Sequence, residues 1–134
     1  MMNKQSFPNL TVLLIDDDPI SNLLAQIKLR QLGIKSVTSV ENGLRALNHL
    51  QSKKPDLILL DINMPTMDGF EFLNANEKYN LCPETPIVML TSSVRSRDRN
   101  RALQYLSVIE YIEKPLTTLK IERVLVKLSL KDRV

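Results

Sequence analysis

Three short polar clusters in this chain each directly follow a run of four apolar residues. The pairs of run and cluster are residues 12–15 with Asp16, Asp17 and Asp18, residues 57–60 with Asp61, and residues 87–90 with Thr91 and Ser92. Continuous apolar runs of this length are typical of strands buried on both faces of a parallel sheet. Because parallel strands end at the same edge of a sheet, we expect the three clusters to meet there, where open α/β sheets build their sites.

The acidic residues at this edge predict a divalent-metal site. Carboxylates from Asp16, Asp17 and Asp61 would lie close together, and like charges repel strongly unless a cation lies among them. Carboxylate, backbone carbonyl and water oxygens are the ligands that suit Mg²⁺. The sequence therefore predicts Mg²⁺ as a cofactor.

A hydroxyl and an ammonium group are expected at the same edge. Thr91 follows the apolar run at 87–90, and Lys114 comes after a strand predicted at 109–112. Pro115 permits a cis peptide bond that would direct the lysine back over the sheet. Carboxylates, a metal ion, a hydroxyl and an ammonium around one point can position and neutralise a phosphoryl group, so the set indicates phosphoryl transfer.

The elements that must position these groups follow from five alternations of an apolar run with an amphipathic stretch. Right-handed crossovers place helices on both faces of the sheet, which predicts an α/β fold with a doubly wound, five-stranded parallel sheet and five helices. The predicted strands are 12–15, 36–40, 57–60, 87–90 and 109–112. The predicted helices cover 19 to about 32, 43 to about 53, 70 onward, about 97–106, and 119 to about 130.

Helix ends and faces are also marked in the sequence. Asp18 before Pro19 and Asn42 are predicted N-cap residues, and Asp68 with Gly69 permits the turn before the third helix. A helical stripe on the first helix consists of Ile20, Leu23, Leu24, Ile27 and Gln31, and on the fifth helix the inward residues are Ile121, Val124, Leu125 and Leu128. Both stripes are typical of amphipathic helices.

Length and composition predict one intracellular domain. A chain of 134 residues, 43% hydrophobic and 25% charged, has room for one core, at about 11–130, and is not disordered. The single cysteine, Cys82, excludes an internal disulfide and fits a reducing compartment as an inert thiol. With no signal peptide and no apolar run long enough to cross a bilayer, we expect a cytoplasmic protein with no membrane partner.

The net charge of +3 is unevenly distributed. Residues 1–94 carry a balance of −2 and residues 95–134 a balance of +5. The basic part has no interleaved aromatic residues and no helix-turn-helix pattern, so we expect no nucleic-acid partner. Arginines at 95, 97, 99 and 101 point about 200° apart in alternation on a helix and cannot form one stripe. A protein that docks on them would be acidic.

Four motifs, in order and correctly spaced from about residue 11 to about residue 130, resemble the receiver domain of two-component response regulators. They read LIDDDP at 14–19, DINMPTMDG at 61–69, MLTS at 89–92 and YIEKP at 111–115. The resemblance implies a flavodoxin-like receiver fold in one domain, residues 1–134. It also implies a signalling switch rather than a turnover enzyme.

The resemblance assigns roles to individual residues. Asp61 would be the phosphoacceptor, which takes a phosphoryl group from the phosphohistidine of a sensor histidine kinase or a histidine phosphotransfer protein. Asp17 would bind Mg²⁺ directly, Asp16 mainly through water, and Asn63 through its backbone carbonyl. Thr91 would bind phosphoryl oxygens.

Lys114 would also bind phosphoryl oxygens. Tyr111 would be an aromatic switch that turns inward when Thr91 moves. The surface of the fourth helix, fifth strand and fifth helix would then bind a downstream protein. His49, on the second helix, would be an ordinary surface histidine.

Four functions remain open at this point. The first is a stand-alone switch of the chemotaxis type, and the second is a relay intermediate that passes the phosphoryl group to a histidine phosphotransfer protein. The third, a Mg²⁺-dependent phosphatase of the haloacid-dehalogenase type, is disfavoured because Asn63 stands where a second catalytic Asp is expected and the chain has no room for a cap domain. The fourth, a piece of a hybrid kinase, is disfavoured by Met1 and by an ordinary ending after the last helix.

Overall fold

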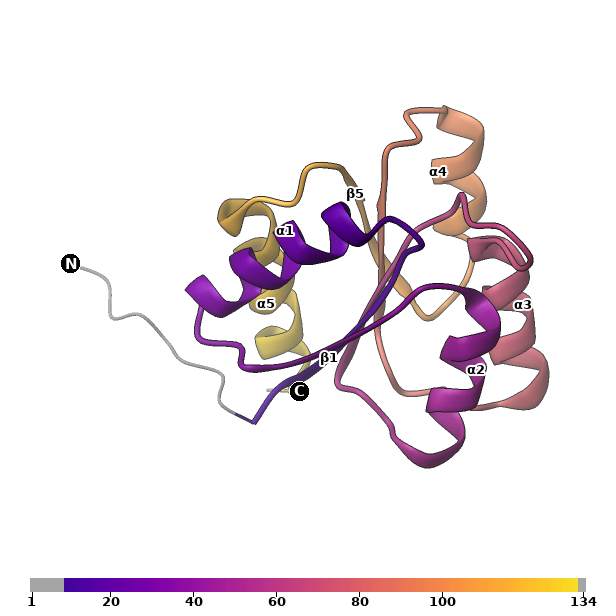
Figure 1. The fold of residues 1–134 in the computed structure, drawn as a ribbon, viewed down its shortest axis with the longest axis horizontal. Coiled ribbons are helices and arrows are strands. Elements are labelled where there is room, and N and C mark those ends of the chain that lie inside the picture. The colour runs from indigo at the N-terminus through magenta and orange to yellow at the C-terminus, as the bar shows by residue number, and fades with distance from the viewer. Residues whose placement is uncertain (1–8, 133–134) are drawn as a thin grey trace.

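The computed structural model of the protein describes residues 9–132. The outermost residues of the domain predicted over 1–134 lie outside this range. Within it, strands and helices alternate along the chain (Figure 1). The strands are β1 Thr11–Ile15, β2 Ser36–Val40, β3 Leu57–Leu60, β4 Ile87–Thr91 and β5 Val108–Glu113. The helices are α1 Pro19–Gln31, α2 Gly43–Ser52, α3 Gly69–Tyr79, α4 Ser96–Ala102 and α5 Thr118–Asp132.

The strands form one parallel sheet in the order β2-β1-β3-β4-β5. One face is covered by α1 and α5 and the other by α2, α3 and α4 (Figure 1). Side chains of β1 alternate between the two, since Leu13 packs in the cluster with Phe72 of α3 while Leu14 packs in the cluster with Leu29 of α1. This two-sided burial explains the continuous apolar runs. The predicted doubly wound α/β fold is confirmed.

The apolar stripe that predicted the first helix does not face the sheet. Ala25 and Leu29 are the buried residues of α1. The side chains of the stripe are exposed instead, with relative exposures of 67% for Ile20, 56% for Leu23, 50% for Leu24 and 43% for Ile27. Helix α1 therefore has apolar residues on two faces, one against the sheet and one toward solvent. In the fifth helix the inward residues are as expected, and Ile121 and Val124 are fully buried.

The helix predicted at about 97–106 ends earlier than expected, at Ala102. Successive turns replace its last part, because the Tyr105 N–H donates to the Ala102 carbonyl and the Val108 N–H to the Tyr105 carbonyl, both at 3.1 Å. The Tyr105 hydroxyl also donates to Asn74 Oδ1 of α3 at 2.6 Å. This tertiary contact holds Tyr105 against α3 and directs the chain into β5, which begins one residue before its predicted start.

Helix α3 begins in contact with the loop that carries Asp61. Asp68 and Glu71 form a capping box, in which each side chain accepts from the backbone N–H of the other residue at 2.8 and 3.0 Å. The Gly69 N–H donates to the Ile62 carbonyl at 2.8 Å. A Cβ atom at Gly69 would lie 2.5 Å from the Asp61 carbonyl oxygen, closer than non-bonded atoms approach. Glycine is therefore required there by the backbone it contacts.

Replacement of Gly69 by alanine should test the close approach between Gly69 and the Asp61 backbone. Gly69→Ala should lower the free energy of unfolding by about 2 kcal/mol or more, because backbone atoms must shift to admit the methyl group. Gly43→Ala is the matched control: Gly43 is also the first residue of a helix, but the atoms nearest to its Cβ would be those of the Met67 side chain rather than backbone. Its cost should stay below about 1 kcal/mol. Urea denaturation followed by circular dichroism measures both, and equal losses would contradict this account.

Candidate functional site

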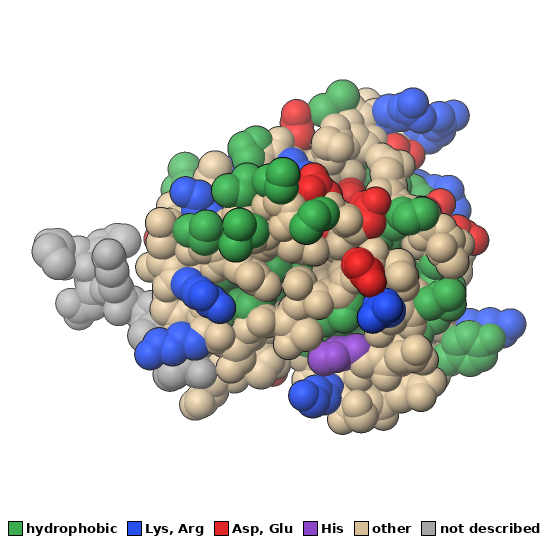
Figure 2. Space-filling view, in the orientation of Figure 1, with side chains coloured by type: hydrophobic (Ala, Val, Ile, Leu, Met, Phe, Trp, Pro, Cys, Tyr) green, Lys and Arg blue, Asp and Glu red, His purple; other side chains and the backbone are tan. Residues whose placement is uncertain are grey.

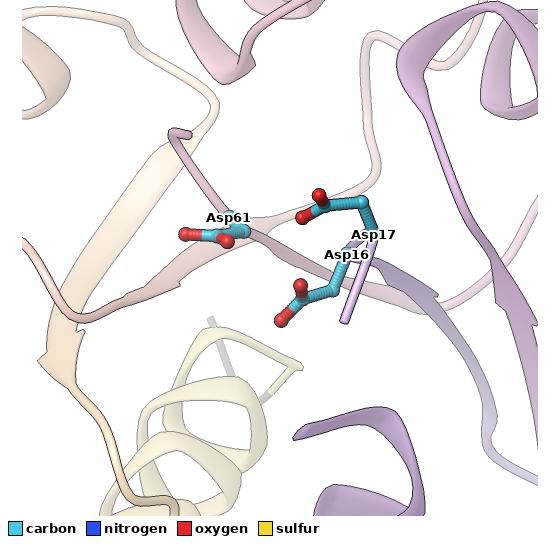
Figure 3. A group of neighbouring side chains, drawn as sticks. All are labelled: Asp16, Asp17 and Asp61. Carbon is cyan, nitrogen blue, oxygen red and sulfur yellow. The ribbon is translucent and has the colours of Figure 1, made fainter. Parts of the chain in front are cut away.

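Three carboxylates meet at the carboxyl edge of the sheet. Asp16 and Asp17 follow β1, and Asp61 follows its neighbour β3, whose last residue pairs with Ile15. One carboxylate oxygen from each lies within 4.8 Å of the others (Figure 3). Asp16 and Asp61 are buried, whereas Asp17 is exposed to solvent. The strand pattern predicted this meeting of acidic groups, and the structure shows it.

Lys114 inserts its ammonium group between the two buried carboxylates. Its Nζ lies 2.5 Å from Asp16 Oδ2 and 3.4 Å from Asp61 Oδ2. The Lys114 N–H donates to the Thr91 carbonyl at 2.8 Å, which fixes the start of the loop after β5. The peptide bond between Lys114 and Pro115 is cis, as the sequence allowed.

The electrostatics leave this edge short of positive charge. Burial raises the pKa of Asp61, and the charge of Asp16 adds to that effect while the charge of Lys114 opposes it. Burial also disfavours the charged form of Lys114, but its hydrogen bond to Asp16 and the charge of Asp61 outweigh this, so the pKa of Lys114 is raised. The ammonium stays protonated at neutral pH, yet one cation does not balance three carboxylates.

The donor set fits Mg²⁺, because it consists of carboxylate oxygens that lie close together. Both oxygens of Asp16 already have partners, since Oδ1 accepts from the Asp18 N–H at 2.9 Å and Oδ2 binds Lys114. No hydrogen bond to Asp17 occurs among the described side chains, and its exposed carboxylate is free to bind a cation. Asn63 is exposed two residues after Asp61, and its role as a ligand stays a prediction.

Thr91 and Tyr111 are linked through one residue that the sequence reasoning missed. Thr91 is fully buried, and its Oγ1 accepts from the Ser93 N–H at 3.2 Å. The Tyr111 hydroxyl donates to the Ser93 carbonyl at 3.1 Å. Burial raises the pKa of Tyr111, so the hydroxyl stays protonated and able to donate. The only sequence signal for Ser93 is its place in the strand-end loop, two residues after Thr91.

A second missed residue is Asn22, in the first turns of α1. Its Nδ2 donates to the backbone carbonyl of Asp16 at 2.9 Å, which ties the helix to the acidic loop. A polar residue close behind the acidic cluster is the signal that could have found it. His49 lies on α2 and takes no part in the carboxylate group.

Comparison with known proteins identifies this arrangement. The family model described as the response regulator receiver domain matches residues 12–126, which is most of the chain. The chain belongs to the response regulator receiver domain family. Receiver domains of two-component systems are signalling switches, and the fold and acidic pocket described above are those of this family.

Three similar proteins illustrate the relationship. The sensor histidine kinase CheAY of Helicobacter pylori is 38% identical over 115 residues, which cover 84% of this chain and 14% of that protein. A two-component response regulator from Cytophaga hutchinsonii has a TM-score of 0.81 at 31% identity, covering 87% of this chain and 94% of the other. The receiver domain of a sensor histidine kinase from Pseudomonas aeruginosa has a TM-score of 0.78 at 28% identity, covering 90% and 97%. That structure has a magnesium ion coordinated in its active-site cleft.

This receiver domain spans only about one seventh of the length of the kinase CheAY.

No helix in residues 9–132 combines the length and the apolar character needed to cross a bilayer.

We expect millimolar Mg²⁺ to bind the native carboxylates, to relieve their repulsion and so to stabilise the protein. We expect a gain of about 1–3 kcal/mol, seen as a rise in melting temperature. Asp17→Asn should lose most of this gain. Asp18→Asn is the matched control, because Asp18 caps α1 by accepting from the Ile20 N–H, and asparagine caps helices equally well. Equal losses of the Mg²⁺ effect in the two variants would contradict the assignment of Asp17.

Proposed function

We propose that this receiver domain accepts a phosphoryl group on Asp61 from the phosphohistidine of a sensor histidine kinase or a histidine phosphotransfer protein, and thereby changes its affinity for a partner protein. The observation that carries this proposal is the position of Asp61, beside Asp16 and Asp17 and within 3.4 Å of the Lys114 ammonium. The cytoplasm is the proposed location, and the buried, unpaired thiol of Cys82 fits a reducing compartment.

The chemistry is a direct displacement at phosphorus. A carboxylate oxygen of Asp61 attacks the phosphorus atom, the bond from phosphorus to the donor imidazole nitrogen breaks, and that nitrogen keeps the electron pair and takes up a proton. Lys114 neutralises charge on the phosphoryl oxygens, and the Thr91 hydroxyl donates to one of them. A Mg²⁺ ion held by Asp16, Asp17, Asp61 and the Asn63 carbonyl would neutralise the remaining charge.

A surface for the phosphodonor lies beside this site. The exposed stripe of α1, defined by Ile20, Leu23, Leu24 and Ile27, follows directly after the acidic loop at the carboxyl end of β1. Figure 2 shows hydrophobic side chains gathered over α1 next to a group of acidic ones. An exposed apolar patch at a reactive edge indicates a protein contact. This supports a phosphohistidine presented by a protein rather than by a small molecule alone.

Phosphorylation of Asp61 is tested directly by intact-mass measurement. Wild-type protein incubated with a small-molecule phosphodonor and Mg²⁺ should gain the mass of one phosphoryl group. Asp61→Asn should gain none, because an amide is not a nucleophile of this kind. Excess EDTA should slow the wild-type reaction by at least about tenfold, since charge neutralisation is the main catalytic effect available here. A product that persists in Asp61→Asn, or that forms equally with EDTA, would refute the proposal.

The proposed switch runs through Ser93. Its N–H binds Thr91 and its carbonyl binds Tyr111, so a movement of Thr91 toward a phosphoryl group would pull the loop that Tyr111 holds. That loop leads into α4, and the N-cap residue Arg95 and the helix arginines at 97, 99 and 101 are all exposed. Arg101 lies over the Phe70 ring of α3, with 4.0 Å between the guanidinium carbon and the ring centroid. The partner surface would consist of α4, β5 and α5, and its basic character favours an acidic partner.

Output is tested by partner capture with and without a phosphoryl mimic bound at Asp61. A partner should bind the mimic-loaded protein more tightly, and added salt should weaken the complex. Arg97→Glu should reduce capture while phosphorylation continues, whereas Lys114→Ala should reduce the difference between the two states. Equal affinity for both states would reject the switch and favour the relay role, in which the phosphoryl group passes on to a histidine phosphotransfer protein.

A further inference from the structure

The loop between β5 and α5 aims Lys114 at the two buried carboxylates. At the Lys114 N–H this loop is held by the Thr91 carbonyl. The carbonyls on both sides of Lys114 are held by another residue: Lys120 Nζ donates to the Glu113 carbonyl at 2.8 Å and to the Pro115 carbonyl at 3.1 Å. One ammonium group therefore binds both ends of the three-residue segment that contains Lys114.

Lys120 is itself well placed for this contact. It lies in the first turn of α5, and its backbone N–H donates to Thr117 Oγ1 at 3.2 Å. Its side chain is half-buried, whereas Glu113 and Pro115 are exposed. Pro115 has no N–H, so this part of the loop cannot be fixed by donation from its own backbone. The lysine supplies the donors that the loop lacks.

We propose that Lys120 is a positioning residue, which directs the Lys114 ammonium at Asp16 and Asp61 by holding the carbonyls of Glu113 and Pro115. The Lys114 ammonium lies at the end of a long, flexible side chain, so a small rotation of the Lys114 backbone displaces the ammonium from the site. Hydrogen bonds from a charged donor are stronger than neutral ones and restrict that rotation. The role in catalysis rests on the proposed function, but the contact with the loop does not.

The variants Lys120→Met and Lys120→Arg test the donor group of the side chain, because methionine keeps most of its length without a donor or a charge, whereas arginine keeps both. Phosphorylation by a small-molecule donor should be about threefold to tenfold slower in Lys120→Met, as expected for loss of one or two exposed hydrogen bonds. Lys120→Arg should restore most of the rate. Lys127→Met is the matched control, because Lys127 also reaches from α5 to a β5 carbonyl, that of Ile109 at 3.3 Å, but at the opposite end of the strand. It should stay within about twofold of wild type.

A double-mutant cycle identifies the residue through which Lys120 acts. In a Lys114→Ala background, Lys120→Met should have no further effect on the rate, because no ammonium remains to be positioned. A full, additive loss in that background would overturn the proposal and assign the effect to long-range charge.

Hydrogen exchange gives a readout that does not depend on phosphoryl transfer. The Lys114 amide should exchange faster in Lys120→Met than in Lys127→Met, because the loop that presents it to Thr91 is released. Equal exchange in the two variants would overturn the inference. If the wild type accepts no phosphoryl group, the proposed function fails, and amide exchange alone then decides whether Lys120 holds the loop.

Discussion

The repulsion among three carboxylates at one sheet edge is the constraint around which this structure is organised. Asp16 and Asp61 follow paired residues of β1 and β3, so the register of the two strands brings the acids together. Burial removes the water that would screen them. Both strands are almost fully buried on both faces, and this apolar packing supplies the stability with which the fold holds the charges in place. Lys114 offsets part of the repulsion, and a divalent cation bound at this edge would offset the remainder.

The carboxyl edge of the sheet is joined to its neighbouring loops and to α3 by hydrogen bonds and close backbone contacts. Thr91 and Lys114 are joined by a backbone hydrogen bond between β4 and the loop after β5, and Gly69 places the start of α3 against the loop of Asp61. Ser93 joins Thr91 to Tyr111. Since packed interiors and hydrogen-bonded loops move between discrete arrangements, we expect charge added at Asp61 to act on the surface through these few hydrogen bonds. The proposed output surface of α4, β5 and α5 lies at the far end of these bonds.

Two parts of the outer surface differ in the side chains that they expose. Helix α1 presents apolar side chains beside the acidic loop, while α4 presents arginines. The stripe on α1 leaves much of its apolar area in water, where it adds little to folding stability, so contact with another protein explains it better than the fold itself. A donor that docks by apolar contact and a partner drawn by charge would use separate surfaces of one small domain. The two surfaces could therefore be altered independently.

The amino-acid pattern alone is enough to predict the parallel sheet, the caps at Asp18, Asn42 and Asp68, and the meeting of Asp16, Asp17 and Asp61, because all of these follow from local patterns and from the direction of parallel strands. The remaining features depend on tertiary contacts. Periodicity predicted α1 but could not tell which of its two apolar faces meets the sheet, since that depends on how the helix packs against other elements. The end of α4 was fixed by the bond from Tyr105 to Asn74, and the roles of Ser93, Asn22 and Lys120 arise from contacts between distant or polar residues. Such contacts leave no periodic signal, because a hydrogen bond requires only that two groups meet in space.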